Sequence, residues 1–313
     1  MTGKRVPHLF ADRRVYRIAL LLCGAVVLTW LAWEARNDLQ RVLASTHPSV
    51  FVAAVALGVL FMAAQGMLFS RLMTKHGSQN ETGNLVAAFL LSQPGKYIPG
   101  KIWSPVMQSF ALKQETSFAG IAIANMELAA IAIIQTTALG VACLRPGSPL
   151  VITCALAAAL SLSIAVMMLP TAMLIARASP RLTTMLRIRP PGNGYRNTPL
   201  REAIALAGVT LGANFLASWC VLSAAGSVIP SGAHAPILSS LYLGFATSML
   251  AIPVPAGIGI REAATAGVGA YIAPGIPNSL IISIALLARC WQLAVDGTCL
   301  GVGAMLQVYL KRR

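Results

Sequence analysis

Six long apolar stretches constrain the fold of this chain more than any other feature of its sequence. Each one approaches or exceeds the ~20 residues that a helix needs to cross the hydrocarbon core of a bilayer. They cover residues 18–33, 50–69, 118–144, 150–176, 203–229 and 280–308. The composition agrees, since 57% of the residues are hydrophobic and 11% are charged, whereas soluble domains carry about 25% charged residues. The sequence therefore predicts an all-α polytopic membrane protein and excludes an ordinary cytosolic enzyme.

Two further apolar stretches, 85–112 and 237–272, are interrupted in the middle by proline and glycine. Proline removes an amide donor and clashes with the preceding turn, so it ends a helix. Broken backbone at membrane depth is tolerated where it is buried in protein or lines a water-filled cavity. We therefore predict two re-entrant, broken helical hairpins. Their breaks contain Pro94, Gly95, Pro99 and Gly100 in the first hairpin, and Pro253, Pro255, Gly257 and Gly259 in the second.

The distribution of basic residues predicts the orientation. The chain has 24 Lys and Arg against 9 Asp and Glu. The basic residues gather in residues 1–17, in the loop 177–201 and in the last residues, 311–313. The connections 230–236 and 274–279 have none, and the first loop, after residue 33, is mixed in charge. Because short cytoplasmic loops are enriched in Lys and Arg, both termini are expected in the cytoplasm.

We divide the chain into a basic cytoplasmic tail, residues 1–17, and one transmembrane domain, residues 18–313. The first stretch is expected to remain as an anchor, because no small-x-small cleavage site follows it. Each half of the domain, 18–145 and 150–308, has three full spans and one hairpin. Three crossings place the second half on the opposite face, which predicts an inverted-topology repeat. Many secondary transporters are built in this way, with a binding site near the midplane.

Charged residues inside these segments are the candidate functional residues, because each costs roughly 2.5–3.5 kcal/mol at a helix centre on insertion scales. The basic candidates are Lys96, Lys101, Arg261 and Arg289, and the acidic ones are Glu127, Glu262 and Asp296. Together they leave one positive charge in excess. This excess would suit an anionic head group.

The charges at the two breaks have a functional and a structural interpretation. Lys96 and Lys101 flank the first break, where a helix N-terminus and two ammonium groups would bind a phosphate. Alternatively, both lysines reach out to the cytoplasmic interface. After the second break, Arg261 would clamp a phosphate and Glu262 would favour the positive helix end. Alternatively, the two residues pair with neighbours and fix the hairpin.

Two sets of polar residues lie within full spans. Arg289, Gln292 and Asp296 share one face of the last span, so this face is expected to meet the protein interior or an aqueous cavity. The alternative is a structural Arg–Asp relay that holds this helix to its neighbours. Glu127 in the third span would pair with Arg289 or a lysine, or else hold a proton and couple transport to protons. His and Cys residues show no metal-ligand spacing, so we expect no metal and no cofactor.

The two breaks carry a family resemblance. The segments Gly-Lys-Tyr-Ile-Pro-Gly-Lys-Ile-Trp at 95–103 and Pro-Ala-Gly-Ile-Gly-Ile-Arg-Glu-Ala at 255–263 resemble the signatures of the lysylphosphatidylglycerol synthase transmembrane-region family. Its members include the flippase part of the multiple peptide resistance factor. The number and order of spans match over nearly the whole chain, although the family often has two glycines where this chain has Ala256 and Gly257. No soluble domain for charging a lipid follows the spans, so the resemblance implies lipid translocation and not aminoacylation.

The expected function is therefore that of a flippase, and not of an enzyme, in the bacterial inner membrane. Its partners would be the phospholipid bilayer and an anionic lipid, either a polyprenyl-phosphate-linked sugar or a phospholipid. Alternating access would follow from rocking one half against the other. The alternatives are an integral membrane enzyme and a scaffold for other proteins of envelope lipid or glycan biosynthesis. Nucleic-acid binding is not expected, because the basic loop lacks stacking aromatic residues.

Overall fold

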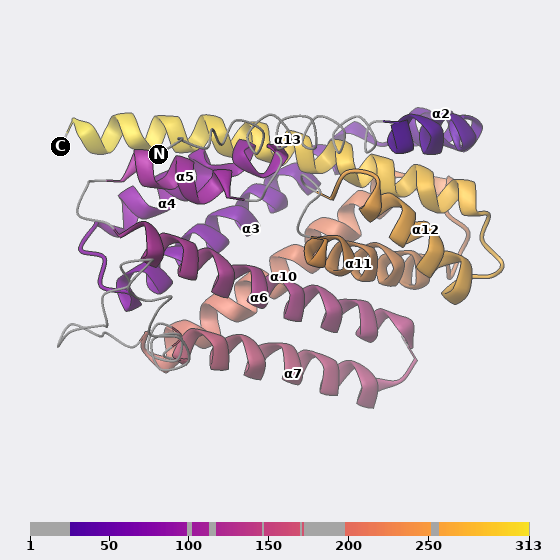
Figure 1. Cartoon of the computed structure of the whole chain (residues 1–313). Coiled ribbons are helices and arrows are strands. Elements are labelled where there is room, and N and C mark those ends of the chain that lie inside the picture. Colours follow the sequence, from indigo (N-terminus) through magenta and orange to yellow (C-terminus); the bar gives the residue numbers. More distant parts are fainter. Residues whose placement is uncertain are drawn as a thin grey trace, which may run out of the picture.

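The computed structural model describes residues 26–98, 102–112, 117–145, 147–169, 171, 198–251 and 257–312. These residues form helices joined by turns and short connections (Figure 1). The long helices are α3 (Pro48–Lys75), α6 (Phe118–Leu144), α7 (Pro149–Met168), α10 (Leu200–Ala224) and α13 (Asn278–Lys311). The shorter ones are α2 (Arg36–Ser45), α4 (Thr82–Leu91), η1 (Gln93–Tyr97), α5 (Trp103–Ala111), η2 (Gly226–Val228), α11 (His234–Leu250) and α12 (Ile260–Ile272).

Within the described residues, five helices are long and apolar enough to cross a membrane: α3, α6, α7, α10 and α13. They correspond to five of the six predicted spans. Half of the sixth prediction, residues 18–25 of 18–33, falls outside the described residues, and residues 26–34 are helical. The chain is thus a multi-pass helical membrane protein, as predicted. The exact number of spans and the inverted repeat stay predictions.

The ends of these helices depend on local sequence features, which the length of an apolar stretch does not predict. α6 has the predicted bounds, whereas α3 continues six residues beyond the predicted end at residue 69. α10 ends before the predicted residue 229, because Gly226 adopts a left-handed conformation with φ 64°. This is the usual way in which glycine terminates a helix.

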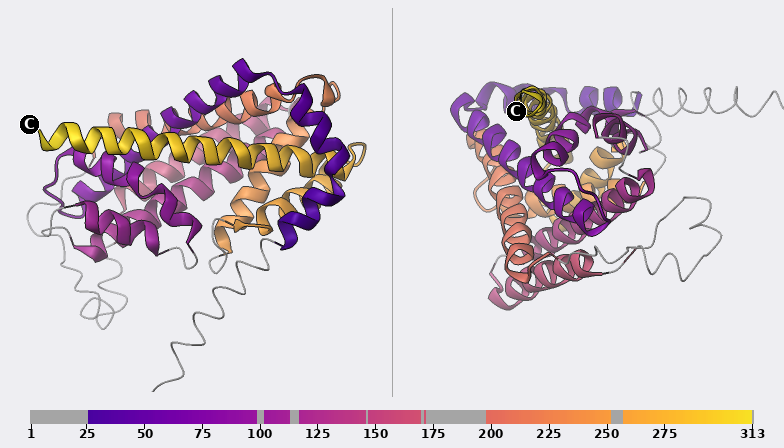
Figure 2. Two further views of the ribbon diagram at one scale, coloured as in Figure 1. Left: turned by 90° about the horizontal axis from the view of Figure 1, so that it is seen from above. Right: turned by 90° about the vertical axis from the view of Figure 1, so that its left-hand side faces the viewer.

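Both predicted breaks are present. The first apolar stretch forms α4, the turn η1 and α5, and the second forms α11 and α12. At the first break, a side chain on Gly95 would place its Cβ 2.7 Å from the Ser104 nitrogen, so only glycine lets the turn pack against the start of α5. Figures 1 and 2 show the two broken segments towards opposite ends of α13, with α4 and α5 nearer the C-terminus.

The two predicted halves are packed into each other and do not form two separate lobes. α3 of the first half packs along α10 of the second, α6 packs on α7 and α11, and α4 packs on α13. Small residues permit close approach: a Cβ on Gly140 of α6 would lie 2.8 Å from Leu243 of α11, and one on Gly303 of α13 would lie 3.0 Å from Leu90 of α4. The main apolar cores accordingly draw residues from both halves.

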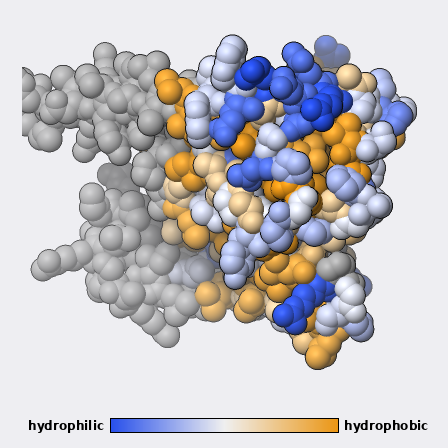
Figure 3. Space-filling model, turned by 90° about the vertical axis from the view of Figure 1, so that its right-hand side faces the viewer, coloured by the Kyte–Doolittle hydropathy of each residue, from blue (hydrophilic) through white to orange (hydrophobic). Residues whose placement is uncertain are grey.

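The helix α2 corrects the prediction that this part of the chain is a plain loop. It lies across the end of the bundle opposite the C-terminus (Figure 1). Asp38 accepts a hydrogen bond from Ser279 of α13, and Ser45 donates one of 2.7 Å to the Ala225 carbonyl. Figure 3 shows hydrophilic residues gathered along the upper edge of this end, where α2 lies. Its polar composition hides the helix from a search for apolar stretches.

Candidate functional site

The first break is attached to the middle of α13 by an ion pair. In the turn η1, Lys96 donates a hydrogen bond of 2.8 Å from Nζ to Oδ1 of Asp296. The neighbouring Tyr97 hydroxyl donates one of 2.6 Å to the other carboxylate oxygen of Asp296. The Lys96 side chain is 23% exposed and that of Asp296 is 5% exposed. Lys96 therefore meets a buried carboxylate in the protein interior, in contrast to the predicted alternative of a lysine at the interface.

The second break is attached to the same helix, α13, by two hydrogen bonds, one made by Arg261 and one by Glu262. Arg261 donates a hydrogen bond of 2.6 Å from one guanidinium nitrogen to Oε1 of Gln292. Its guanidinium carbon also lies 4.9 Å from the ring centroid of Phe245 in α11, a distance suited to a cation–π contact. Arg289 donates a hydrogen bond of 3.1 Å from Nε to Oε1 of Glu262. Arg289 and Asp296 thus each bind a residue of a different break, so both connect α13 to its neighbours.

The glycines of the second break shape its backbone. Gly257 and Gly259 have φ values of 64° and 80°, a left-handed conformation that residues with a side chain rarely adopt. The Gly259 N–H donates a hydrogen bond of 3.0 Å to Oε2 of Glu262, which caps the N-terminus of α12. Glu262 thus uses one carboxylate oxygen for the helix end and the other for Arg289. Its role is to fix the hairpin, which is the structural interpretation of this residue.

Together, these contacts form one charged cluster at the middle of α13, which we call the central cluster. It consists of Lys96, Tyr97, Arg261, Glu262, Arg289, Gln292 and Asp296. The two breaks are therefore not separate turns on the surface, since both contact one polar face of a single long helix. The charges of Lys96 and Arg261 are also close enough to interact electrostatically.

Arg261 is the unusual member of the central cluster. Lys96 and Arg289 each pair with a carboxylate, but Arg261 forms no ion pair with any described residue; its hydrogen-bond partner is the neutral amide of Gln292. Arg261 is only 7% exposed. Burial of a charge is costly unless an opposite charge accompanies it. The arrangement can therefore accept one anionic group at Arg261.

Five of the predicted residues lie outside the described part of the chain. They are Lys101, Pro99, Gly100, Pro253 and Pro255. The described remainder of the predicted breaks, Pro94, Gly95, Gly257 and Gly259, lies at or beside the turns that carry Lys96 and Arg261.

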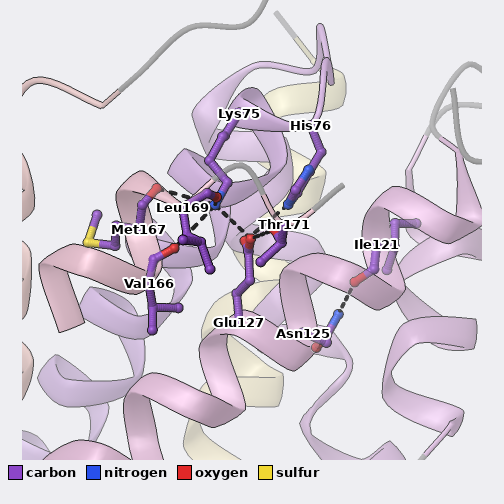
Figure 4. Close-up of polar contacts among 9 residues, drawn as sticks. All are labelled: Lys75, His76, Ile121, Asn125, Glu127, Val166, Met167, Leu169 and Thr171. Atoms are coloured by element: carbon purple, nitrogen blue, oxygen red, sulfur yellow. Dashed lines mark hydrogen bonds and ion pairs between the residues drawn. The ribbon is translucent and has the colours of Figure 1, made fainter. Parts of the chain in front are cut away.

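Glu127 belongs to a second cluster (Figure 4), which shares no residue with the central one. It accepts a hydrogen bond of 2.6 Å from Nζ of Lys75, lies 3.0 Å from Nε2 of His76, and accepts a further hydrogen bond from Thr171. Pairing with a lysine is one of the predicted outcomes, whereas pairing with Arg289 is wrong. Because Glu127 is already surrounded by partners, this site favours a structural role.

Lys75 also binds the carbonyl groups at the C-terminal end of α7. Its ammonium group donates hydrogen bonds to the carbonyls of Val166, Met167 and Leu169, at 3.4, 3.2 and 3.0 Å, in the last turn of α7 and just after it. The last carbonyls of a helix lack partners within the helix, and a cation there is favourable. We call Lys75, His76, Glu127 and Thr171, with these carbonyls, the end clamp, because it joins the ends of α3 and α7 to α6.

Sequence reasoning missed Lys75, His76 and Tyr97. The apolar stretch was predicted to end at residue 69, which placed Lys75 and His76 in a loop. A signal was available, because residues 70–75 contain no helix breaker and Gly77 follows them with φ 84°. Tyr97 lies within the first signature segment, but its hydroxyl is neutral, so a search for charged residues within the membrane does not find it.

Comparison with known proteins identifies a family. The family model described as "Lysylphosphatidylglycerol synthase TM region" matches residues 14–298 of this chain. No curated protein and no solved structure matches it. The matched range contains both breaks, the central cluster and the end clamp. The chain therefore belongs to the family of the lysylphosphatidylglycerol synthase transmembrane region.

Proposed function

We propose that this protein is a flippase that moves an anionic lipid across the bacterial inner membrane. The single observation that carries the proposal is Arg261, a buried cation whose hydrogen-bond partner is an uncharged amide. A guanidinium can bind a phosphate through two parallel N–H donors. The lipid would be a polyprenyl-phosphate-linked sugar or a phospholipid, and both termini would face the cytoplasm.

The neighbours of Arg261 suit a phosphate. When the guanidinium turns from Gln292 to a phosphate, the Gln292 amide is released and can donate a hydrogen bond to it. Lys96, the most exposed of the ionised residues in the cluster, lies on the first break and neutralises Asp296, so the charge of Arg261 is left for the phosphate. The acyl or prenyl chains would stay in the bilayer while the head group occupies the cluster. The cluster thus supplies at mid-depth the donors that hydrocarbon lacks.

The packing supports movement at the two breaks over movement of whole halves. Because α3, α6 and α4 of the first half interlock with α10, α11 and α13 of the second, rocking of two rigid halves would disrupt the core. At the breaks themselves, the turn η1 and the start of α12 instead have separate polar attachments to α13: Lys96 and Tyr97 hold the first, and Glu262 and Arg261 hold the second. We propose that release of one set of contacts opens the cluster to one side of the membrane, and release of the other set opens it to the other side.

The test compares Arg261→Ala and Lys96→Ala with the wild type in proteoliposomes that contain a fluorescent anionic lipid. Each substitution removes the excess positive charge of the cluster, so both variants should lose transport while they keep the helical circular dichroism spectrum. Arg71→Ala is the matched control, because Arg71 pairs with Glu202 between α3 and α10, outside the cluster. Wild-type rates in both cluster variants would refute the proposal.

The same preparation separates transport from catalysis. In detergent there are no two leaflets, so a flippase leaves the lipid chemically unchanged. Mass spectrometry of the lipid after incubation with the purified protein should therefore show no product. Conversion of the lipid in detergent would favour the membrane-enzyme alternative.

A further inference from the structure

The charge balance of the central cluster limits what it can bind. Among the described residues, the cluster has three cations, Lys96, Arg261 and Arg289, and two carboxylates, Glu262 and Asp296. All of these except Lys96 are buried. In such a site an uncompensated charge is unfavourable whatever its sign. One added negative charge neutralises the cluster, and a second one leaves it negative.

We infer that the cluster selects lipids whose head group is joined through a single phosphodiester, with one negative charge, over lipids joined through a diphosphate. The inference rests on the proposed function and assigns the selection to Asp296. A monoanionic phosphate can join Arg261 while both existing ion pairs stay closed. A diphosphate would compete for Lys96, and Asp296 would then lose its only cation among the described residues.

Asp296 is better placed for this role than Glu262. Both oxygens of Glu262 serve the fold, one at the Gly259 N–H and one at Arg289. The oxygens of Asp296 are bound by Lys96 and Tyr97, which both belong to the short turn at the first break. Asp296 therefore neutralises the cation that a second phosphate would need. It also repels that phosphate directly.

The informative substitution is Asp296→Asn. Asparagine has nearly the same shape, and its carbonyl still accepts the Tyr97 hydrogen bond, but the cluster gains one positive charge. Lys96 is then available to a second phosphate. The matched control is Glu202→Gln, which removes one negative charge from the pair with Arg71, about one-third exposed and outside the cluster.

The assay uses two fluorescent lipids with the same short polyprenol and the same hexose, joined through one phosphate or through two. Initial transport rates in proteoliposomes give a ratio of the monophosphate to the diphosphate lipid. We expect a ratio of at least about ten for the wild type and for Glu202→Gln. Asp296→Asn should lower it by about tenfold, a change of about 1.4 kcal/mol in relative barrier height. Fluorescent phosphatidylglycerol, another single phosphodiester, reports whether a glycerol lipid is also accepted.

A double variant tests charge balance independently of how well Asp296→Asn folds. Lys96→Gln combined with Asp296→Asn removes one charge of each sign, so the net charge of the cluster is that of the wild type. We expect it to transport the monophosphate lipid and to restore the wild-type preference, in contrast to Lys96→Ala alone.

The outcomes separate the two proposals. A wild type that moves both lipids at equal rates, or a folded Asp296→Asn with an unchanged ratio, would overturn the charge selection and leave the flippase standing. A wild type that moves none of the three lipids would instead contradict the proposed function itself.

Discussion

Substitution of Lys75 by methionine tests whether the end clamp acts as a buried ion pair or as an ordinary contact between helices. Lys75 has no exposed surface, and its ammonium group serves Glu127 and three carbonyls of the α7 end. Methionine fills a similar volume but donates no hydrogen bond. After the substitution, His76 and Thr171 are the remaining described partners of Glu127. The carbonyls at the end of α7 lose the hydrogen-bond donor that Lys75 supplied.

The two interpretations predict different magnitudes. Side-chain hydrogen bonds between membrane helices are worth about 0.6 kcal/mol on average, whereas removal of one partner of a buried ion pair costs about 3–5 kcal/mol. We expect the larger value for Lys75→Met. Glu127→Gln should also lower the free energy of unfolding. The loss in the double variant should be at least ~1 kcal/mol smaller than the sum of the two single losses, because each single variant already removes the ion pair.

The measurement is reversible unfolding in mixed micelles with increasing dodecyl sulfate, followed by circular dichroism. Arg71→Met is the matched control, because its ion pair with Glu202 also joins two helices but is about one-third exposed. Such exposed pairs contribute about 0–1 kcal/mol. A Lys75→Met variant as stable as the control, or strict additivity in the double variant, would refute a buried ion pair at this end of the bundle.

Two further predictions concern the breaks. Gly95→Ala should reduce both thermal stability and transport, because its Cβ would lie 2.7 Å from the Ser104 backbone nitrogen; Gly208→Ala, where a Cβ meets nothing within 4 Å, serves as the control, and equal melting temperatures would contradict the packing described for η1. Cysteine introduced in place of Ile98 or Ile260, beside the charged residues of the two breaks, should react with membrane-impermeant maleimide in a way that depends on the side of addition and on the lipid present. Labelling that is the same with and without lipid, from both sides, would argue for a static scaffold.

The helical architecture could be predicted from the sequence because it depends on short-range rules. Apolar length located the five long helices, and α6 matches its predicted bounds. Proline and glycine located both breaks, since few residues other than glycine accept the φ of 80° seen at Gly259. By contrast, α2 was missed because its stability comes from contacts such as the one between Asp38 and Ser279, which are far apart in the chain.

The candidate site was predicted only as a group of residues. The intramembrane charges are conspicuous because they are costly, so Lys96, Arg261, Arg289 and Asp296 could be selected without a structure. The pairing of these charges could not be predicted, because helical periodicity relates Arg289 to Asp296 but says nothing about residues of other helices. The partner of Glu127 was equally hidden, since Lys75 lies 52 positions earlier in the chain.

In the proposed transport, the spacing of the polar residues on α13 sets how far a head group would travel in one step. Arg289, Gln292 and Asp296 are three and four positions apart, and each faces a different contact: Glu262, Arg261 and Lys96. At ~1.5 Å of rise per residue, the seven positions span roughly 10 Å, about a third of a hydrocarbon core ~30 Å thick. A phosphate that moves along this face would meet a new donor about every turn of the helix, so the remaining distance to each water layer shrinks to ~10 Å.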